Sequence, residues 1–469
     1  MSYSRRGFLG VSAASLAFAG IARAEEDDAI YVNEVEGYGA LKEDPFGIFD
    51  LPEGFSYRIV SQAGDMMDDG LAVPHKFDGM GCFAAGGVLG LGDDKVILVR
   101  NHELKPGDRN HGPTGARGRF AANLDRDKAY DVDAAGRVLP GGTTTLVYNI
   151  RKQTLEREHL SLAGTSINCA GGVTPWGSWL TCEETTTRAG QGVGKDHGWI
   201  FEVPSRARGL VDPIPLKAMG RFKHEAACVD PRTGIVYLTE DTPDSLLYRF
   251  LPETPGELVR GGRLQALGFV DAAAGCDTRN WKGAVGMTQG DWRAARWIDL
   301  DNPESTDDDL RLRGAKAGAA IFARGEGIFW GKGEFYFTCT SGGAAGAGQI
   351  MRYIPGEREG QSDEADAPGK AQLFLESRDA RVLDYGDNIA VAPWGHILVC
   401  EDRYSDTRRN HLKGVTPEGK VYTIGRNVFR ENAELAGVCF SPDGSTLFVN
   451  IYWPGITLAI TGPWASFKA

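Results

Sequence analysis

The sequence predicts an all-β protein, specifically a six-bladed β-propeller with long loop excursions over one mouth. Three observations predict this fold. Glycine accounts for 63 of the 469 residues and proline for 22, which is typical of a chain with many tight turns and short strands. The apolar runs are rich in β-branched and aromatic residues and are bounded by glycine and proline, as strands are. Finally, one strand–turn–strand layout recurs six times.

Each repeat contains a polar residue, a short apolar strand, a turn, a second apolar strand and another polar residue. Turns such as Pro175-Trp176-Gly177 and Pro393-Trp394-Gly395 separate the two strands. Further strands, for example 144–150 and 349–354, lie between the repeats and would complete the blades. The alternative interpretation is a sandwich of unrelated hairpins. The six repeats are 78–103, 169–184, 225–241, 326–341, 387–402 and 434–451.

The polar ends of the repeats predict a functional site. In an antiparallel hairpin the first residue of the first strand and the last residue of the second lie at the same end. The ends of six inner hairpins would therefore ring one mouth of the central channel, which the excursions at 106–142 and 271–320 would cover. Many carboxylates cannot converge without a compensating cation, so we expect several metal ions there. The first strands begin at Asp78, Cys169, Glu225, Glu326, Asp387 and Glu434.

The N-terminus has the pattern of an export signal. Arg5 and Arg6 form a twin-arginine pair, followed by an apolar run at 9–20 and a small-residue site ending at Ala24. The run is shorter than the ~20 residues that span a bilayer. We therefore expect a signal peptide at 1–24, and no membrane span in the mature chain. The twin-arginine export machinery would be a partner, residues 25–469 would form a single domain, and the location would be periplasmic or secreted.

The net charge and the cysteine spacings argue against some classes of protein. The formal net charge is −12 and no basic stripe is present, which argues against a nucleic-acid partner. The cysteine spacings show no disulfide framework and no zinc motif. Cys169 differs from most of the others because its neighbours are polar and glycine-rich rather than apolar.

Several blocks together resemble the PhoX-type alkaline phosphatases, over about residues 45–455. The most specific block is NCAGGVTPWGSWLTCEE at 168–184. The others are NHE at 101–103, KHEA at 223–226, LTED at 238–241, RGEG at 324–327, GDNI at 386–389, CED at 400–402 and FSPDGSTLFVN at 440–450.

This resemblance implies an exported, propeller-shaped phosphomonoesterase that acts on a small phosphorylated substrate and uses iron and calcium. Arg324 matches the arginine that binds the phosphate, which a guanidinium can grip at two oxygens. A thiolate suits a transition metal such as iron, whereas an oxygen-only set suits calcium. The residues that match the iron side are Cys169, Glu184, Glu225 and Glu326. Those in the motifs of the calcium side are Glu103, Glu240, Asp241, Asp387, Asn388, Glu401 and Asp402.

Two positions depart from the family pattern. Gly325 stands where the family has proline, and we expect it to loosen the backbone of Arg324. Tyr452 and Trp453 replace a polar Gln-His pair, which makes that side of the mouth more apolar. Two other functions fit the same pattern of acids: a calcium-dependent propeller lactonase or esterase, which has no use for the thiolate of Cys169, and a non-catalytic propeller whose metals are structural.

Overall fold

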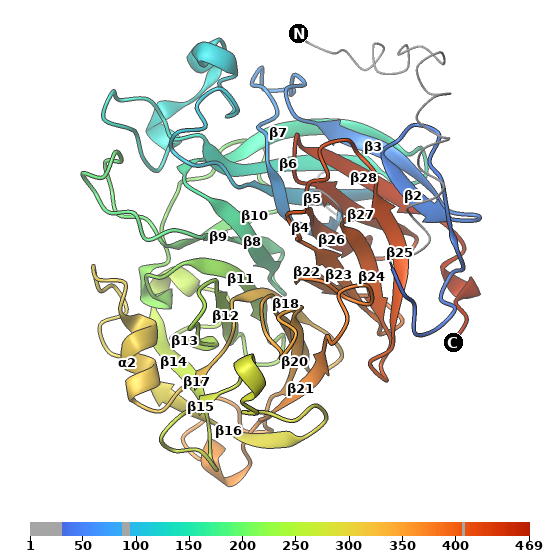
Figure 1. The fold of residues 1–469 in the computed structure, drawn as a ribbon. Coiled ribbons are helices and arrows are strands. Elements are labelled where there is room, and N and C mark those ends of the chain that lie inside the picture. Colours follow the sequence, from blue (N-terminus) through green and yellow to red (C-terminus); the bar gives the residue numbers. More distant parts are fainter. Residues whose placement is uncertain (1–30, 87–93, 406–408) are drawn as a thin grey trace.

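The computed structural model describes residues 31–86, 94–405 and 409–469, and these residues form an all-β protein with a propeller-like arrangement of sheets (Figure 1). The predicted signal peptide at 1–24 lies outside the described residues. Among the described residues the α-helix is α2 (Leu310–Lys316), and none of their helices combines the length and hydropathy that crossing a bilayer requires. Short 3₁₀ turns are η2 (Ala116–Gly118), η3 (Ala121–Asn123), η4 (Arg126–Lys128), η5 (Lys217–Met219), η6 (Leu258–Arg260), η7 (Trp281–Gly283), η8 (Glu364–Asp366) and η9 (Trp464–Ser466).

All six predicted hairpins form, and each is antiparallel. Their first strands contact one another in a closed cycle, from β4 through β8, β11, β18, β22 and β26 back to β4, so they surround the centre of the molecule (Figure 1). The hairpins are β4 (Phe77–Ala84) with β5 (Lys95–His102), β8 (Asn168–Val173) with β9 (Ser178–Glu183), β11 (His224–Val229) with β12 (Val236–Glu240), β18 (Gly325–Trp330) with β19 (Phe335–Cys339), β22 (Gly386–Val391) with β23 (Ile397–Glu401), and β26 (Leu435–Phe440) with β27 (Thr446–Ile451).

Further strands extend the hairpins outward. The last hairpin is extended by β28 (Ile456–Thr461) and then by β3 (Ser56–Gln62), so a strand from the start of the chain completes a sheet from its end. The others are β6 (Gly141–Asn149) and β7 (Thr154–Thr165); β10 (Ile200–Pro204); β13 (Tyr248–Pro252) and β14 (Gly262–Phe269); β20 (Gln349–Ile354) and β21 (Lys370–Glu376); and β24 (His411–Val415) and β25 (Val421–Asn427) with β2 (Phe49–Pro52) and β1 (Leu41–Lys42).

The segment 271–320, which the sequence predicts to be a loop over the mouth, contributes a strand to a sheet. The segment 271–320 contains β16 (Trp292–Asp299), which pairs with β14 at one end and β21 at the other. It therefore joins two four-stranded groups into one nine-stranded sheet instead of only covering the mouth, and the sheets do not separate into six independent units. The same segment holds α2 and the short strand β15 (Cys276–Asp277), which pairs with β17 (Ala320–Ile321).

Small residues let the central strands approach closely. A Cβ atom on Gly79 of β4 would lie 2.5 Å from the Cα atom of Ala170 on β8, and one on Gly327 of β18 would lie 2.7 Å from the carbonyl oxygen of Asp387 on β22. A side chain at either position would push two central strands apart. Glycine here keeps the central channel narrow, which brings the ends of the hairpins together.

Candidate metal centre

Every first strand carries a β-bulge near its start. The register shifts fall between Phe77 and Met80 on β4 and at the matching places on β8, β11, β18, β22 and β26. A bulge bends the strand and re-aims the side chain of the extra residue. The first bulged residue is an acid or a thiol on five strands and glycine on the sixth: Asp78, Cys169, Glu225, Glu326, Asp387 and Gly437.

The bulged residues meet in two groups of possible metal ligands. Ligand atoms of Cys169, Glu184 and Glu225 lie within 4.8 Å of one another, and so do those of Glu225, Glu326 and Asp387. Glu225 belongs to both groups. The structure therefore brings together all four residues that match the iron side, together with Asp387 from the predicted calcium side.

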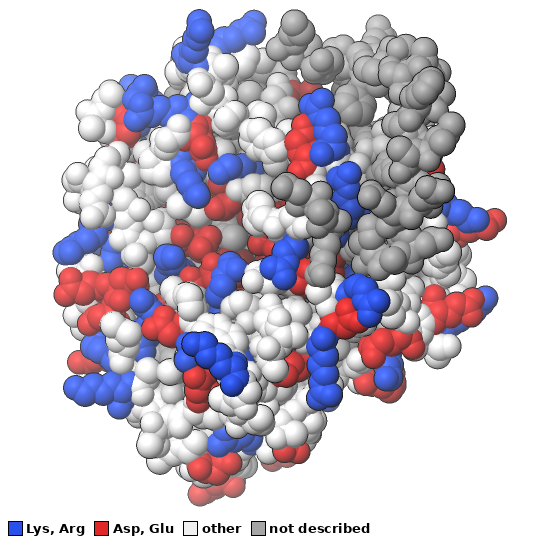
Figure 2. Space-filling view, in the orientation of Figure 1, with Lys and Arg blue, Asp and Glu red and all other residues white. Residues whose placement is uncertain are grey.

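Further acids surround these two groups and act on them electrostatically. Glu103, Asp241, Asp402 and Glu434 interact with the groups through the field of their carboxylates. Figure 2 shows Asp and Glu side chains near the middle of the face on which the first strands converge in Figure 1. We call the whole set the acid–thiol cluster: Asp78, Glu103, Cys169, Glu184, Glu225, Asp241, Glu326, Asp387, Asp402 and Glu434.

The cluster has the unpaired oxygens that a cation needs. Both carboxylate oxygens of Glu225, Oδ1 of Asp387 and Oδ1 of Asp402 are buried and have no hydrogen-bond partner among the described residues. Leaving buried carboxylate oxygens without partners is costly. Metal ions would remove this cost, so the residues present fit a multinuclear metal centre.

Burial and mutual repulsion raise the pKa values of carboxyl groups in the cluster. Desolvation first, and then neighbouring carboxylates, raise the pKa values of Asp78, Glu225 and Asp387 well above the ordinary range. Desolvation and Glu434 raise the pKa of Glu103 to about 7. Such a set of acids remains ionised together only when cations neutralise it.

Cys169 is the one thiol of the cluster, and every cysteine of the described residues is free. Its Sγ lies 3.5 Å from Oδ2 of Asp78. Burial, followed by the charges of Asp78, Glu225 and Glu184, raises the pKa of the Cys169 thiol well above its usual range. A thiolate at this position therefore requires a bound metal, and soft thiolate ligands favour transition metals over calcium.

Two acids of the cluster, Asp78 and Glu434, were absent from the ligand set that the family resemblance implied. Both stand at the start of a predicted first strand, so the hairpin repeat contained the signal. Glu434 lies three residues before Gly437, the bulged residue of β26. Glu434 therefore does not occupy the position in its hairpin that Asp78 occupies in the first one. Its Oε2 accepts a hydrogen bond from the hydroxyl of Tyr404 at 2.6 Å. The hydroxyl of Tyr452 donates in the same way to Oε2 of Glu103.

The structure does not bring Glu401 into the cluster. Its Oε1 accepts from the backbone N–H of Asp384 at 3.0 Å, and its Oε2 accepts from the backbone N–H of His411 and lies 2.9 Å from the ring Nδ1. Although burial alone would raise the pKa of Glu401, Lys413 and His411 outweigh it and lower that pKa. Glu401, on β23, therefore joins β24 to the segment that precedes β22.

Glu240 and Asn388 are also engaged elsewhere. Oε2 of Glu240 accepts from the hydroxyl of Tyr248 at 2.7 Å, while burial raises the pKa of this carboxyl to about 8. Its remaining oxygen, Oε1, is buried without a hydrogen-bond partner among the described residues and lies 4.0 Å from Nη1 of Arg311. Oδ1 of Asn388 accepts from the backbone N–H of Gly437 at 3.1 Å, which links β22 to β26.

Arg324 lies immediately before the bulge on β18. Its Nε and Nη2 bond the two oxygens of Asp241 at 2.7 and 2.9 Å, and Nη2 lies 2.9 Å from Oε1 of Glu326. None of these contacts uses Nη1, and the side chain is 30% exposed. Burial alone would lower the pKa of Arg324, but Glu326 and Asp241 outweigh it and raise that pKa. The charged guanidinium thus borders Asp241 and Glu326 of the acid–thiol cluster.

The backbone of Arg324 is firmly held, contrary to the expectation from Gly325. Arg324 adopts a φ of 52°, in the left-handed region that few residues other than glycine adopt. Its N–H donates to the carbonyl of Thr242, and its own carbonyl accepts from Thr340. The N–H of Gly325 donates to Oγ of Ser245 at 3.1 Å. Proline at 325 would lack that donor, so glycine here allows an additional bond.

Polar side chains on the second strands hold the bulges in place. Nδ2 of Asn101 donates to the carbonyl of Cys169 at 3.0 Å, and Nδ2 of Asn450 donates to the carbonyl of Asp78 at 2.6 Å. Hydroxyls take the same role for two others: Thr239 donates to the carbonyl of Glu326, and Thr338 donates to that of Asp387. Each bond crosses from one hairpin to the next and fixes the backbone of a cluster residue.

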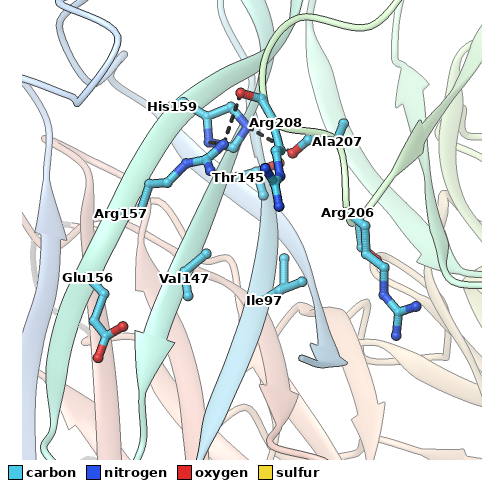
Figure 3. A pocket seen from close by; sticks show the side chains of 10 residues that line it. Ile97, Thr145, Val147, Glu156, Arg157, His159, Arg206, Ala207 and Arg208 are labelled. Carbon is cyan, nitrogen blue, oxygen red and sulfur yellow. Dashed lines mark hydrogen bonds between the residues drawn. The ribbon is translucent and has the colours of Figure 1, made fainter. Parts of the chain in front are cut away.

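A cavity of about 350 Å³ lies elsewhere, between β5, β6, β7 and the 205–208 segment (Figure 3). There Arg157 donates to the carbonyl of Arg208 at 2.9 Å, and Nε2 of His159 lies 3.1 Å from the carbonyl of Ala207. Its lining includes no residue of the acid–thiol cluster. Two of its basic groups, those of Arg157 and His159, contact backbone carbonyls.

The comparisons with known proteins agree with this geometry. The model of the family "Alkaline phosphatase PhoX" matches residues 36–455. The PhoX of Pseudomonas fluorescens, solved in complex with the transition-state analogue vanadate, superposes with a TM-score of 0.66 at 17% identity, covering 92% of this chain and 98% of that one. A gluconolactonase from Xanthomonas campestris superposes with a TM-score of 0.37 at 13% identity, covering 87% and 100%. Among the curated proteins, none matches the chain.

The family match spans most of the chain and includes every bulge of the acid–thiol cluster. The chain belongs to the alkaline phosphatase PhoX family and is a phosphatase.

Proposed function

We propose that the protein is a phosphomonoesterase that hydrolyses small phosphate esters at a multinuclear iron–calcium centre in the acid–thiol cluster. The observation that carries this proposal is the convergence of a half-buried thiol, buried carboxylate oxygens without partners among the described residues, and a charged arginine at one mouth of the channel. Cys169, Glu184, Glu225 and Glu326 would hold iron. The oxygen-only ligands Glu103, Asp241, Asp387 and Asp402, with Asp78 and Glu434, would hold calcium.

When bound, the metal ions would act as Lewis acids on the phosphoryl oxygens and activate the attacking water. The protein's own residues would then orient the ester. The free Nη1 edge of Arg324 would bind one phosphoryl oxygen and stabilise the charge that develops during transfer. Asp241 would hold this guanidinium in a fixed orientation, because two parallel bonds determine the direction of the planar group.

We also propose that the sheets correspond to six blades, one for each bulged first strand, with β16 as an extra strand between the third and fourth. Residues 25–469 would form one domain, and residues 1–24 would direct it through the twin-arginine machinery to the periplasm or beyond. The closed cycle of six first strands supports the count of blades. The export proposal rests on the sequence pattern alone.

The test measures metals and activity on the same purified sample. We expect iron and calcium in the protein and hydrolysis of a chromogenic phosphate monoester, with no turnover of an aldonolactone. Calcium without iron, together with lactone hydrolysis, would favour a lactonase. Bound metals without turnover of either substrate would indicate a binding protein.

A further inference from the structure

The two sides of the mouth differ in chemistry. Lys223 and Arg324 flank Asp241: Lys223 accepts the backbone N–H of Asp241 at its carbonyl, and Arg324 bonds the Asp241 carboxylate. These cations belong to the hairpins of β11 and β18. In the cycle of first strands, the hairpins opposite to them are those of β26 and β4.

Aromatic residues meet at Glu434, which immediately precedes β26 on the opposite side; one of them, Tyr404, comes from the segment that follows β23. Tyr404 is 74% exposed, although its hydroxyl is bonded to Glu434, which is only 7% exposed. The backbone N–H of Tyr452 donates to the carbonyl of the same glutamate, so two segments bearing aromatic residues meet at Glu434. Next to Tyr452, the ring of Trp453 lies 5.3 Å from the rings of both His75 and His111.

An anchored hydroxyl with an exposed ring is an unusual arrangement for a tyrosine. Large aromatic side chains normally bury their rings, because the ring is the apolar part and the hydroxyl is the polar part. Here the bond to Glu434 holds the hydroxyl inward while the face of the ring remains open to solvent. A fixed, open aromatic face is suited to stack on a planar group.

The geometry of phosphoryl transfer determines where the phosphoryl group and the leaving group of the ester would lie. Arg324 would hold the equatorial phosphoryl oxygens at the acid–thiol cluster, and the leaving oxygen departs in line with the attack, on the side opposite to the attacking oxygen. Because the attacking oxygen would come from the buried cluster, the leaving group would point outward to solvent, where the ring of Tyr404 lies exposed. We propose that Tyr404 is a binding platform for the leaving group, and that the enzyme prefers phosphate monoesters of aromatic alcohols. This inference rests on the proposed function for the orientation of the substrate.

The test compares matched ligands that differ only in an aromatic ring. Phenylphosphonate and methylphosphonate are not hydrolysed, so calorimetry reads their binding without turnover. Phenyl phosphate and ethyl phosphate give the kinetic comparison. Tyr404→Ala should weaken phenylphosphonate binding and raise KM for phenyl phosphate about three- to ten-fold, and should change the values for the methyl and ethyl ligands less than twofold.

Two controls separate the ring from other effects. Tyr404→Phe keeps the ring but removes the bond to Glu434, so it should retain most of the preference for the phenyl ligand. Phe46→Ala removes another exposed ring, 66% exposed in the loop before β2, and should change nothing. Metal content is measured in every variant.

The outcomes are distinct. Equal effects of Tyr404→Ala on the phenyl and methyl phosphonates, or no effect on either, would overturn the platform. A wild-type protein that cleaves neither ester would contradict the proposed function, and the phosphonate comparison would still decide whether Tyr404 contacts an aromatic group.

Discussion

Cys169 and Asp78 occupy equivalent bulges on neighbouring strands, and the sulfur of one lies 3.5 Å from a carboxylate oxygen of the other. In a metal-free protein this contact is a thiol beside an acid, because both groups have raised pKa values. With a cation between them, both become ligands. The contact therefore connects the thiol to the oxygen-rich part of the cluster.

Cys169→Ser should lose the transition metal and most of the activity, with a smaller loss of calcium, because a serine hydroxyl is a poor ligand for iron. Metal analysis and phosphate-ester hydrolysis measure both. Cys276→Ser is the matched control, because Cys276 is also a half-buried free thiol, but it contacts Arg293 outside the cluster. If Cys169→Ser kept iron and full turnover, Cys169 would be a packing residue.

Arg324→Ala should lower kcat/KM by about 2–4 kcal/mol, the scale for the loss of one preorganised electrostatic donor. Inorganic phosphate should inhibit more weakly, and metal content should be retained. Arg324→Lys should restore only part of the activity, since an ammonium group lacks the planar fork. Arg293→Ala breaks a similar two-point pair with Asp271 on the outer strand β16 and is the control. Wild-type kinetics and phosphate inhibition in metal-replete Arg324→Ala would remove the arginine from the site.

Asp387→Asn and Glu401→Gln separate a proposed ligand from a structural acid. Oδ1 of Asp387 is buried and has no partner in the described part of the chain, whereas both oxygens of Glu401 accept backbone N–H bonds. Asp387→Asn should reduce bound metal and activity. Glu401→Gln should lower the melting temperature by a few degrees and leave the metal content of the folded protein unchanged. Loss of calcium in folded Glu401→Gln would place this acid among the ligands.

Removing the metals should inactivate the enzyme and lower its melting temperature by several degrees, because ions that bind only the folded cluster stabilise the folded state. Scanning calorimetry before and after chelation measures the shift, and adding the metals back should reverse it. Unchanged melting after verified removal of the metals would show that the cluster does not bind them as a unit.

The buried His197 should make stability depend on alkaline pH. Its ring nitrogens lie 2.7 Å from Glu183 and 3.1 Å from Asp131, and the ring of Tyr130 packs against it edge-on. Burial alone would lower the pKa of His197, but the two acids outweigh it and raise that pKa to about 9, above the ordinary 6.5. The stabilisation, on the order of 3 kcal/mol, is therefore complete below pH 6.5 and is lost as the pH rises through about 9.

Thermal unfolding between pH 6 and pH 10 measures this dependence. His197→Gln should be less stable at pH 6 and should lose much of the decline on the alkaline side. His159→Gln is the control, because burial lowers the pKa of His159, the opposite direction to the shift of His197. An identical alkaline decline in wild type and His197→Gln would contradict the assignment.

The sequence predicted the hairpins and most of the cluster because both depend on local patterns. The strand signals and turns lie within short windows, and the polar ends follow from hairpin geometry. By contrast, the bulges are set by contacts between neighbouring strands, which no window contains. Glu434 was therefore aligned with Asp78, whereas the true equivalent is Gly437.

Glu240 and Glu401 show a second limit of prediction from the sequence, which concerns the direction in which a side chain points. At the end of a second strand, an acid can face the channel or turn back to accept a hydrogen bond from its own sheet, and both choices have the same sequence pattern. Tyr248 and His411, on the third strands of their sheets, determine the outcome. The role of β16 likewise depends on two sheets that come together only in the folded protein.

The pairing of β3 with β28 has a consequence for the order of folding. Gln62 pairs with Ile456, so nearly the whole chain must be made and arranged before this sheet is complete. Contacts of such long sequence separation form late and slow the overall folding reaction. Asp78 and Glu434 belong to hairpins that meet next to this closure. A chain that stops short of its final strands would therefore lack an intact cation-binding ring, and uptake of metal would mark the chains that have closed.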